Sequence, residues 1–135
     1  MNKPHYLHTI KESTQDLCDA LTEDYRTYTI RSLKHLTSDY SKNRLASIED
    51  GTENLMRFEI REGRKYYKIV QCEDNGKGYQ DQSVNAFVDK KSGRVYKPAS
   101  WKSPAKGVRY DLSDEINKAY CLNRASWAGG YLYKR

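Results

Sequence analysis

The sequence predicts an α+β fold in which N-terminal helices and a C-terminal helix pack on a small antiparallel sheet of about four strands. Three observations support this prediction: a helical stripe of apolar residues near the N-terminus, alternating strand patterns in the middle of the chain, and a helix-start signal near residue 113. The length of 135 residues fits one domain spanning residues 1–135, and no repeat, low-complexity tract or linker divides it.

Helical periodicity dominates the first third of the chain. The stripe comprises Leu7, Ile10, Thr14, Leu17, Leu21, Tyr25 and Tyr28. Thr9 and Glu12 have the spacing of a capping box, which predicts a helix start near Ile10. β-branched residues at 27–30 break the phase, which resumes at Leu33, Leu36 and Tyr40. We therefore expect two helices or one kinked helix ending within residues 40–46, packed on the domain's own sheet or, alternatively, forming a dimer seam.

Alternating patterns predict two β-hairpins in the middle of the chain. In the first strand, Met56, Phe58 and Ile60 alternate with charged residues, which is typical of a half-buried strand. The expected strands are residues 56–61, 66–72, 84–89 and 94–97. The turn between the last two strands is typical of a type I turn followed by Gly93 at positive φ, the G1-bulge arrangement.

Two elements are expected after the last hairpin. Proline cannot donate ladder hydrogen bonds, so residues 98–107, which contain two prolines, are expected to form an ordered loop. Ser113 followed by two acids predicts a helix start, and the pair Gly129-Gly130 predicts its end. The inward stripe of this helix is expected to contain Ile116, Tyr120 and Trp127. Residues 131–133 are a candidate edge strand.

Composition argues against membrane, secreted and metal-clustered proteins. No apolar stretch approaches the roughly 18–20 residues that span a bilayer, and residues 1–10 lack the apolar segment of a secretory signal. We therefore expect an intracellular protein without membrane contact. Cys18, Cys72 and Cys121 are odd in number and form no CxxC pair, so we expect three free thiols and neither a cofactor nor a structural metal.

Charge is unevenly distributed along the chain. Residues 1–54 carry seven Lys/Arg and nine Asp/Glu, whereas residues 55–135 carry seventeen and nine. The bias is strongest in residues 90–110, which contain seven cations and no acid. A basic stripe attracts phosphate backbones, anionic lipids or acidic protein surfaces, and a merely solvated lysine-rich face is the alternative.

The same basic segment contains aromatic residues. Lysine and arginine supply phosphate contacts and aromatic rings supply stacking faces, a combination typical of single-strand binding. The candidate nucleic-acid-binding residues are Lys90, Lys91, Arg94, Tyr96, Lys97, Trp101, Lys102, Lys106 and Arg109. For Trp101, packing in the core is the alternative to a contact role.

Other motifs give weaker signals. The run Asn75-Gly76-Lys77-Gly78 lacks both the third glycine of a dinucleotide fingerprint and the ending of a P-loop. His5 and His8 could share a helical face but need carboxylates to bind a metal. Acids near the expected strand ends are Glu73, Asp74, Asp81 and Asp89, and their spacing specifies no catalytic pair or metal site.

The segment from Phe87 to Lys102, with its continuation from Pro104 to Tyr110, resembles small uncharacterised proteins of marine tailed bacteriophages, of the cyanophage type. The resemblance covers about a quarter of the chain and contains no catalytic motif. It implies a phage gene product that acts in the cytoplasm of a bacterial host or in the virion.

Together these observations favour a non-enzymatic phage accessory protein whose basic hairpin and loop contact DNA or RNA. A protein-interaction or virion component, with a phage or host protein as partner, is the second hypothesis. A small hydrolase is the third. A monomer is favoured over a homodimer, because the helical stripe is too short for a sustained coiled-coil seam.

Overall fold

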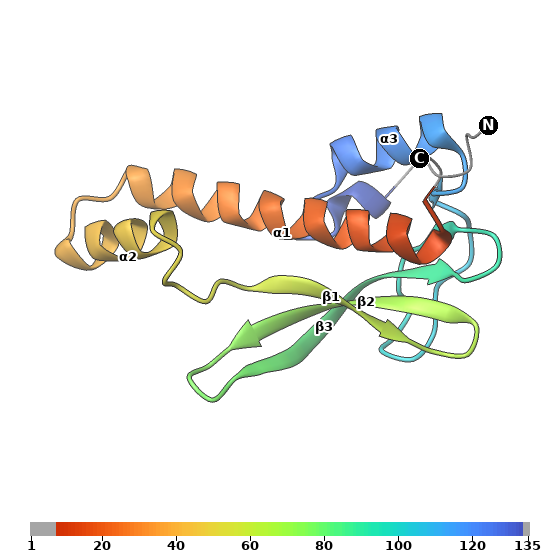
Figure 1. Ribbon diagram of the computed structural model, residues 1–135, viewed down its shortest axis with the longest axis horizontal. Helices are drawn as coiled ribbons and strands as arrows, with labels where there is room; N and C mark the ends of the chain where they lie inside the picture. The colour runs from red at the N-terminus through yellow and green to blue at the C-terminus, as the bar shows by residue number, and fades with distance from the viewer. Residues whose placement is uncertain (1–7, 134–135) are drawn as a thin grey trace.

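The computed structural model describes residues 8–133, which form three α-helices, a five-stranded antiparallel sheet and one 3-10 helix (Figure 1). The helices are α1 (Ile10–Lys34), α2 (Asp39–Glu49) and α3 (Glu115–Arg124), and the 3-10 helix is η2 (Gly130–Leu132). The strands are β1 (Arg57–Glu62), β2 (Tyr66–Asp74), β3 (Tyr79–Asp89), β4 (Arg94–Tyr96) and β5 (Tyr110–Asp111). The predicted α+β class is confirmed.

The five strands form a meander in which each strand pairs with the next one along the chain. Both predicted hairpins are present, and β3 begins at Tyr79, earlier than predicted, so that it also pairs with β2 along its whole length. The short β5 adds a fifth strand to the four expected. Its two residues are too few to produce an alternating pattern in the sequence.

Helix α1 lies across one face of the sheet (Figure 1). The predicted capping box is present, because the Thr9 hydroxyl accepts a hydrogen bond from the Glu12 N–H while the Glu12 carboxylate accepts one from the Thr9 N–H. The predicted break at residues 27–30 is wrong: α1 continues to Lys34, and the chain turns only at residues 35–38. The small helix penalty of β-branched residues does not outweigh the packing of α1 against β1 and α2.

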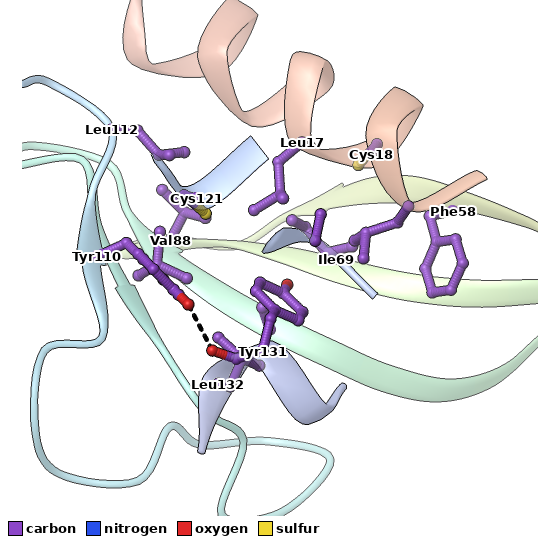
Figure 2. Close-up of a cluster of buried hydrophobic side chains, with 14 of the residues drawn as sticks. Leu17, Cys18, Phe58, Ile69, Val88, Tyr110, Leu112, Cys121, Tyr131 and Leu132 are labelled. Atoms are coloured by element: carbon purple, nitrogen blue, oxygen red, sulfur yellow. Dashed lines mark hydrogen bonds between the residues drawn. The ribbon is translucent and has the colours of Figure 1, made fainter. Parts of the chain in front are cut away.

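The hydrophobic core lies between the sheet and helices α1 and α3 (Figure 2). Its labelled members are Leu17 and Cys18 from α1, Phe58, Ile69, Val88 and Tyr110 from the sheet, and Leu112, Cys121, Tyr131 and Leu132. The Tyr110 hydroxyl donates a hydrogen bond of 2.5 Å to the Tyr131 carbonyl. The three cysteines are buried and free, as predicted.

One backbone N–H on the outer edge of β1 is satisfied by a side chain of α1. The Phe58 N–H donates to the Thr22 hydroxyl at 3.0 Å, and the same hydroxyl donates to the Cys18 carbonyl within α1. An exposed strand edge offers unpaired backbone groups to other chains. Thr22 therefore satisfies one of these groups while it fixes the position of α1 over β1.

Two predictions for the C-terminal part are wrong. Ile116 and Tyr120 do not face inward, since they are 83% and 48% exposed, and α3 instead buries Cys121 against the core. Trp127 lies beyond the helix, half-buried against Tyr25 with ring centroids 5.1 Å apart. Residues 131–133 add no strand to the sheet. Tyr131 and Leu132 belong instead to η2, which fills the end of the core, where Tyr131 contacts Tyr110.

Gly93, in the turn between β3 and β4, packs closely against Ser113, and substitution of this glycine tests that contact. Gly93 has φ of +82°, its N–H donates to the Asp89 carbonyl as the predicted bulge requires, and an added Cβ would lie 3.1 Å from the Ser113 backbone nitrogen. Gly76, with φ of +99°, has nothing within 4 Å of such a Cβ. Gly76→Ala should cost about 1–2 kcal/mol of unfolding free energy from the left-handed conformation alone. Gly93→Ala should cost more, and equal losses in urea unfolding would argue against the Ser113 contact.

Candidate nucleic-acid interface

The sheet face opposite the helices, here called the open face, carries an aromatic cluster. Lys68, Phe87 and Tyr96 occupy paired positions on β2, β3 and β4. Side chains alternate along a strand, so these residues point away from Ile69 and Val88, which belong to the core. The ring of Tyr66 lies 5.8 Å from that of Phe87 and 6.2 Å from that of Tyr96.

The segment after β4, here called the Trp101 loop (residues 97–109), reaches across the open face. Backbone hydrogen bonds close it, because the Ala105 N–H donates to the Lys97 carbonyl and the Ala99 N–H donates to the Ser103 carbonyl. The loop is therefore ordered, as predicted. At its tip Trp101 is 45% exposed, and the Lys68 ammonium of β2 lies 4.6 Å from its ring centroid. Trp101 does not belong to the core.

A basic hollow of about 290 Å³ separates the Trp101 loop from the β1–β2 turn. Five cations line it, namely Arg61, Arg64, Lys65, Lys68 and Lys102. Its one acid, Glu62, accepts a hydrogen bond of 2.7 Å from Lys90, which lowers the pKa of the Glu62 carboxyl. The negative charge of Glu62 is therefore already balanced by Lys90, a residue that does not line the hollow.

Four of these cations form no ion pair with an acid of the described residues. Arg61 binds Asp81 at 2.8 Å, and this hydrogen bond lowers the pKa of the Asp81 carboxyl and raises that of the guanidinium. In contrast, no ion pair within residues 8–133 involves Arg64, Lys65, Lys68 or Lys102. The hollow consequently presents positive charge that a mobile anion can neutralise.

Three of the nine candidate residues from the sequence lie at this site. Tyr96 belongs to the aromatic cluster, Trp101 forms the tip of the loop, and Lys102 lines the basic hollow. The sequence placed these residues on one segment. The structure adds that the same segment meets cations from β1, β2 and their connecting turn.

Two other candidates are engaged in structural contacts. The half-buried Lys90 ammonium donates to Glu62 and to the Gly63 carbonyl, so it joins the β3 end to the β1–β2 turn. Arg109 donates from Nε to the Leu132 carbonyl at 2.6 Å, which holds η2 in place.

The remaining four candidates lie outside the basic hollow. Lys97 places its ammonium 4.5 Å from the ring centroid of Tyr133. Lys91 and Arg94 are exposed at the β3–β4 turn, and Lys106 is exposed in the Trp101 loop. The seven cations of residues 90–109 thus have different environments, although they are close in sequence.

The cations contributed by residues 61–68 are absent from the candidates that the sequence pattern indicates. Arg64, Lys65 and Lys68 stand in a segment that also contains Glu59 and Glu62, so its local charge balance is unremarkable. The available signal was the pairing of the first hairpin, in which Lys68 and Tyr66 share one face. The ion pair between Glu62 and Lys90 joins residues 28 positions apart, so only the tertiary structure reveals it.

The other candidate acids act as turn acceptors or ion-pair partners. Asp74 accepts hydrogen bonds from the N–H groups of Gly76 and Gly78, and these bonds lower the pKa of its carboxyl. Asp89 likewise accepts from the N–H groups of Ser92 and Lys91, whereas Glu73 is exposed on β2. In residues 8–133 no cluster of three or more His, Cys, Asp or Glu side chains is placed to hold a metal ion.

The remaining sequence features to place are the histidine pair and the cysteine thiols. His8 binds Asp16 at 2.7 Å, and His5 lies outside the described residues. Burial, with the Asp81 hydrogen bond, raises the pKa of the Cys72 thiol to about 11, so it stays protonated at neutral pH. None of the helices within the described part of the chain is both long and apolar enough to cross a membrane.

Comparison with known proteins identifies a family but not an activity. The model of a family of unknown function (DUF7717) matches residues 2–134. No curated protein and no solved structure matches the chain.

Proposed function

The chain belongs to this family of unknown function, so its activity must be inferred from its own residues, and we propose that it binds nucleic acid through the open face of its sheet. The observation that carries the proposal is the basic hollow, where Arg64, Lys65, Lys68 and Lys102 face one space and form no ion pair within residues 8–133. Phosphates are the natural partners of such a cluster, since they neutralise several cations at once.

The aromatic residues beside the hollow support nucleic acid over other anions. Trp101 presents a large ring to solvent next to Lys68, and Tyr66 and Tyr96 lie in the same cluster. Phosphate contacts position a nucleic acid, whereas rings add stacking with its bases. A simple anion such as inorganic phosphate would engage only the cations and would leave the exposed indole without a contact.

The proposal includes the setting implied by the resemblance of residues 87–110. In that setting the protein is a non-enzymatic phage product that acts in the cytoplasm of a bacterial host. A virion or protein-interaction component is the second candidate, favoured by the neighbouring exposed residues Ile116 and Tyr120 on α3. The hydrolase hypothesis is less favoured, because Asp74, Asp81 and Asp89 already serve as structural acceptors.

Salt dependence of binding tests the proposal. If four phosphates meet the four cations, the slope of log K against log salt on single strands should be near −3, at about −0.7 per contact. The double variant Arg64→Gln/Lys102→Gln should flatten this slope by about 1.4. Fluorescence anisotropy with a labelled oligonucleotide over a salt series measures both values.

The matched control neutralises two exposed lysines elsewhere on the molecule, Lys42 on α2 and Lys77 in the β2–β3 turn. Lys42→Gln/Lys77→Gln removes the same charge and should leave the slope nearly unchanged. An equal flattening in both double variants would mean that net charge, and not the hollow, determines binding. Absence of binding to DNA and RNA at low salt would refute the proposal and favour a protein partner.

A further inference from the structure

We infer that the open face holds a single-stranded chain, with one base stacked on the outer face of Trp101 and an adjacent phosphate in the basic hollow. This inference rests on the proposed function, because it names the form of nucleic acid that the site accepts. Four features of the site support it: the presentation of the indole, the cation behind it, the position of the hollow, and the way a duplex conceals its bases.

The indole of Trp101 is presented by an ordered loop tip. The Ser100 hydroxyl accepts hydrogen bonds of 3.2 Å from the N–H groups of both Lys102 and Ser103, which closes the turn around Trp101. Pro98 and Pro104 form an isolated bridge at the base of this turn. The loop therefore fixes the backbone that carries the ring, which reduces the entropy lost when a base stacks on it.

Lys68 supports the indole from the sheet side. Its ammonium lies 4.6 Å from the Trp101 ring centroid and 5.8 Å from that of Phe87, so it sits between a buried ring and an exposed one. A cation over an aromatic face is attracted by the ring quadrupole. One face of the indole is thus occupied by the protein itself, and the 45% exposure of Trp101 leaves the other side for a ligand.

The basic hollow lies next to the contact between Lys68 and Trp101. Lys68 lines the hollow and also contacts Trp101, so a single side chain joins the stacking face to the phosphate-binding cations. Lys102 follows Trp101 directly in sequence and lines the same hollow, as does Arg64 of the β1–β2 turn. A base on Trp101 and the neighbouring backbone phosphate of one strand can therefore be bound together.

A duplex cannot use this arrangement without losing base pairs. Its bases are stacked on each other, and taking one out of the helix costs a few kcal/mol of unstacking and unpairing. Single strands expose their base faces, and aromatic platforms beside cations bind them with little dependence on sequence. We therefore expect a preference for single strands that depends on Trp101.

The experiment compares a labelled single strand with a hairpin duplex of the same composition at low salt. The wild-type protein should bind the single strand more tightly, and Trp101→Ala should weaken that binding by about 5- to 150-fold while Trp101→Phe recovers part of it. Tyr133→Ala is the matched control, since Tyr133 is also an exposed ring beside a lysine, Lys97, but lies outside the hollow. Its affinity should remain unchanged.

The outcomes separate the inference from the proposed function. Equal affinity for both forms, with Trp101→Ala unaffected, would overturn the inference while nucleic-acid binding stands. Absence of binding to either form would overturn both. Circular dichroism of Trp101→Ala and Trp101→Phe checks folding, and quenching of tryptophan fluorescence by the unlabelled single strand in a Trp127→Phe background reports on Trp101 alone. A bound strand that leaves this emission unchanged would also contradict stacking.

Discussion

Tyr110→Ala is expected to lower the free energy of unfolding by about 3–5 kcal/mol, as removal of a buried aromatic ring does in other cores. The ring is 1% exposed and stacks on Tyr131 with centroids 5.9 Å apart. Its hydroxyl donates to the Tyr131 carbonyl and also interacts with Arg124. The substitution therefore leaves a cavity between β5 and η2 and an unsatisfied carbonyl. Urea unfolding followed by circular dichroism measures the loss.

Two further variants separate the contributions of the ring and the hydroxyl. Tyr110→Phe keeps the ring and should cost about 1–3 kcal/mol, because the buried Tyr131 carbonyl loses its donor. Tyr40→Ala removes a ring that is 72% exposed on α2 and should change stability by less than about 0.5 kcal/mol. If Tyr110→Ala costs no more than Tyr40→Ala, the described core is incorrect.

Leu17→Ala should cost about 2–5 kcal/mol. Leu17 is fully buried and lies in the part of α1 that packs on the sheet and α3 (Figure 2). Because α1 contributes one side of the core, the neighbouring residues cannot easily collapse into the space left by the truncation. Thermal and urea unfolding should show the same single transition at lower midpoint.

Ile116→Ala is the control for Leu17→Ala, because it also truncates a branched aliphatic side chain on a helix but at an exposed position. It should change stability by less than about 0.5 kcal/mol. A large loss for Ile116→Ala would mean that α3 buries its other face, as the sequence pattern suggested. It would also mean that the described orientation of α3 is wrong.

Local signals explain the parts of the fold that could be predicted. The capping box at Thr9 and Glu12, the alternation of Met56, Phe58 and Ile60, and the turn at Gly93 each lie within a few residues. Their geometry is determined by hydrogen bonds and side-chain direction inside one element. These features therefore allow the class and most strands to be predicted before tertiary packing is known.

Other features depend on contacts between distant segments. The apolar residues Ile116 and Tyr120 suggested an inward stripe, but the face of α3 that is buried is the one with Cys121, which packs in the core with Leu17. Likewise, η2 forms where Tyr131 meets Tyr110, a contact across 21 residues. A sequence pattern states which residues are apolar, and the tertiary structure decides which of them are covered.

The candidate site was only partly predictable for the same reason. The basic and aromatic composition of residues 90–109 indicated Trp101 and Lys102 directly. Arg64, Lys65 and Lys68 joined them only because β2 pairs with β3 and the Trp101 loop crosses the sheet. Lys90 and Arg109 were equally prominent in the sequence, but their charges bind Glu62 and the Leu132 carbonyl.

The meander order of the strands has a consequence for synthesis on the ribosome. Turns of only three or four residues join the first four strands in succession, so hairpin pairing can begin as soon as the second strand of each pair emerges. The helical side of the core is completed in two stages, because α1 is synthesised first whereas α3 and η2 are synthesised last. A nascent chain that has emerged only to residue 112 can pair its strands but leaves Val88 and Tyr110 without Cys121 and Leu132 above them. Such an intermediate exposes apolar surface, and we expect it to be the stage at which chaperones bind.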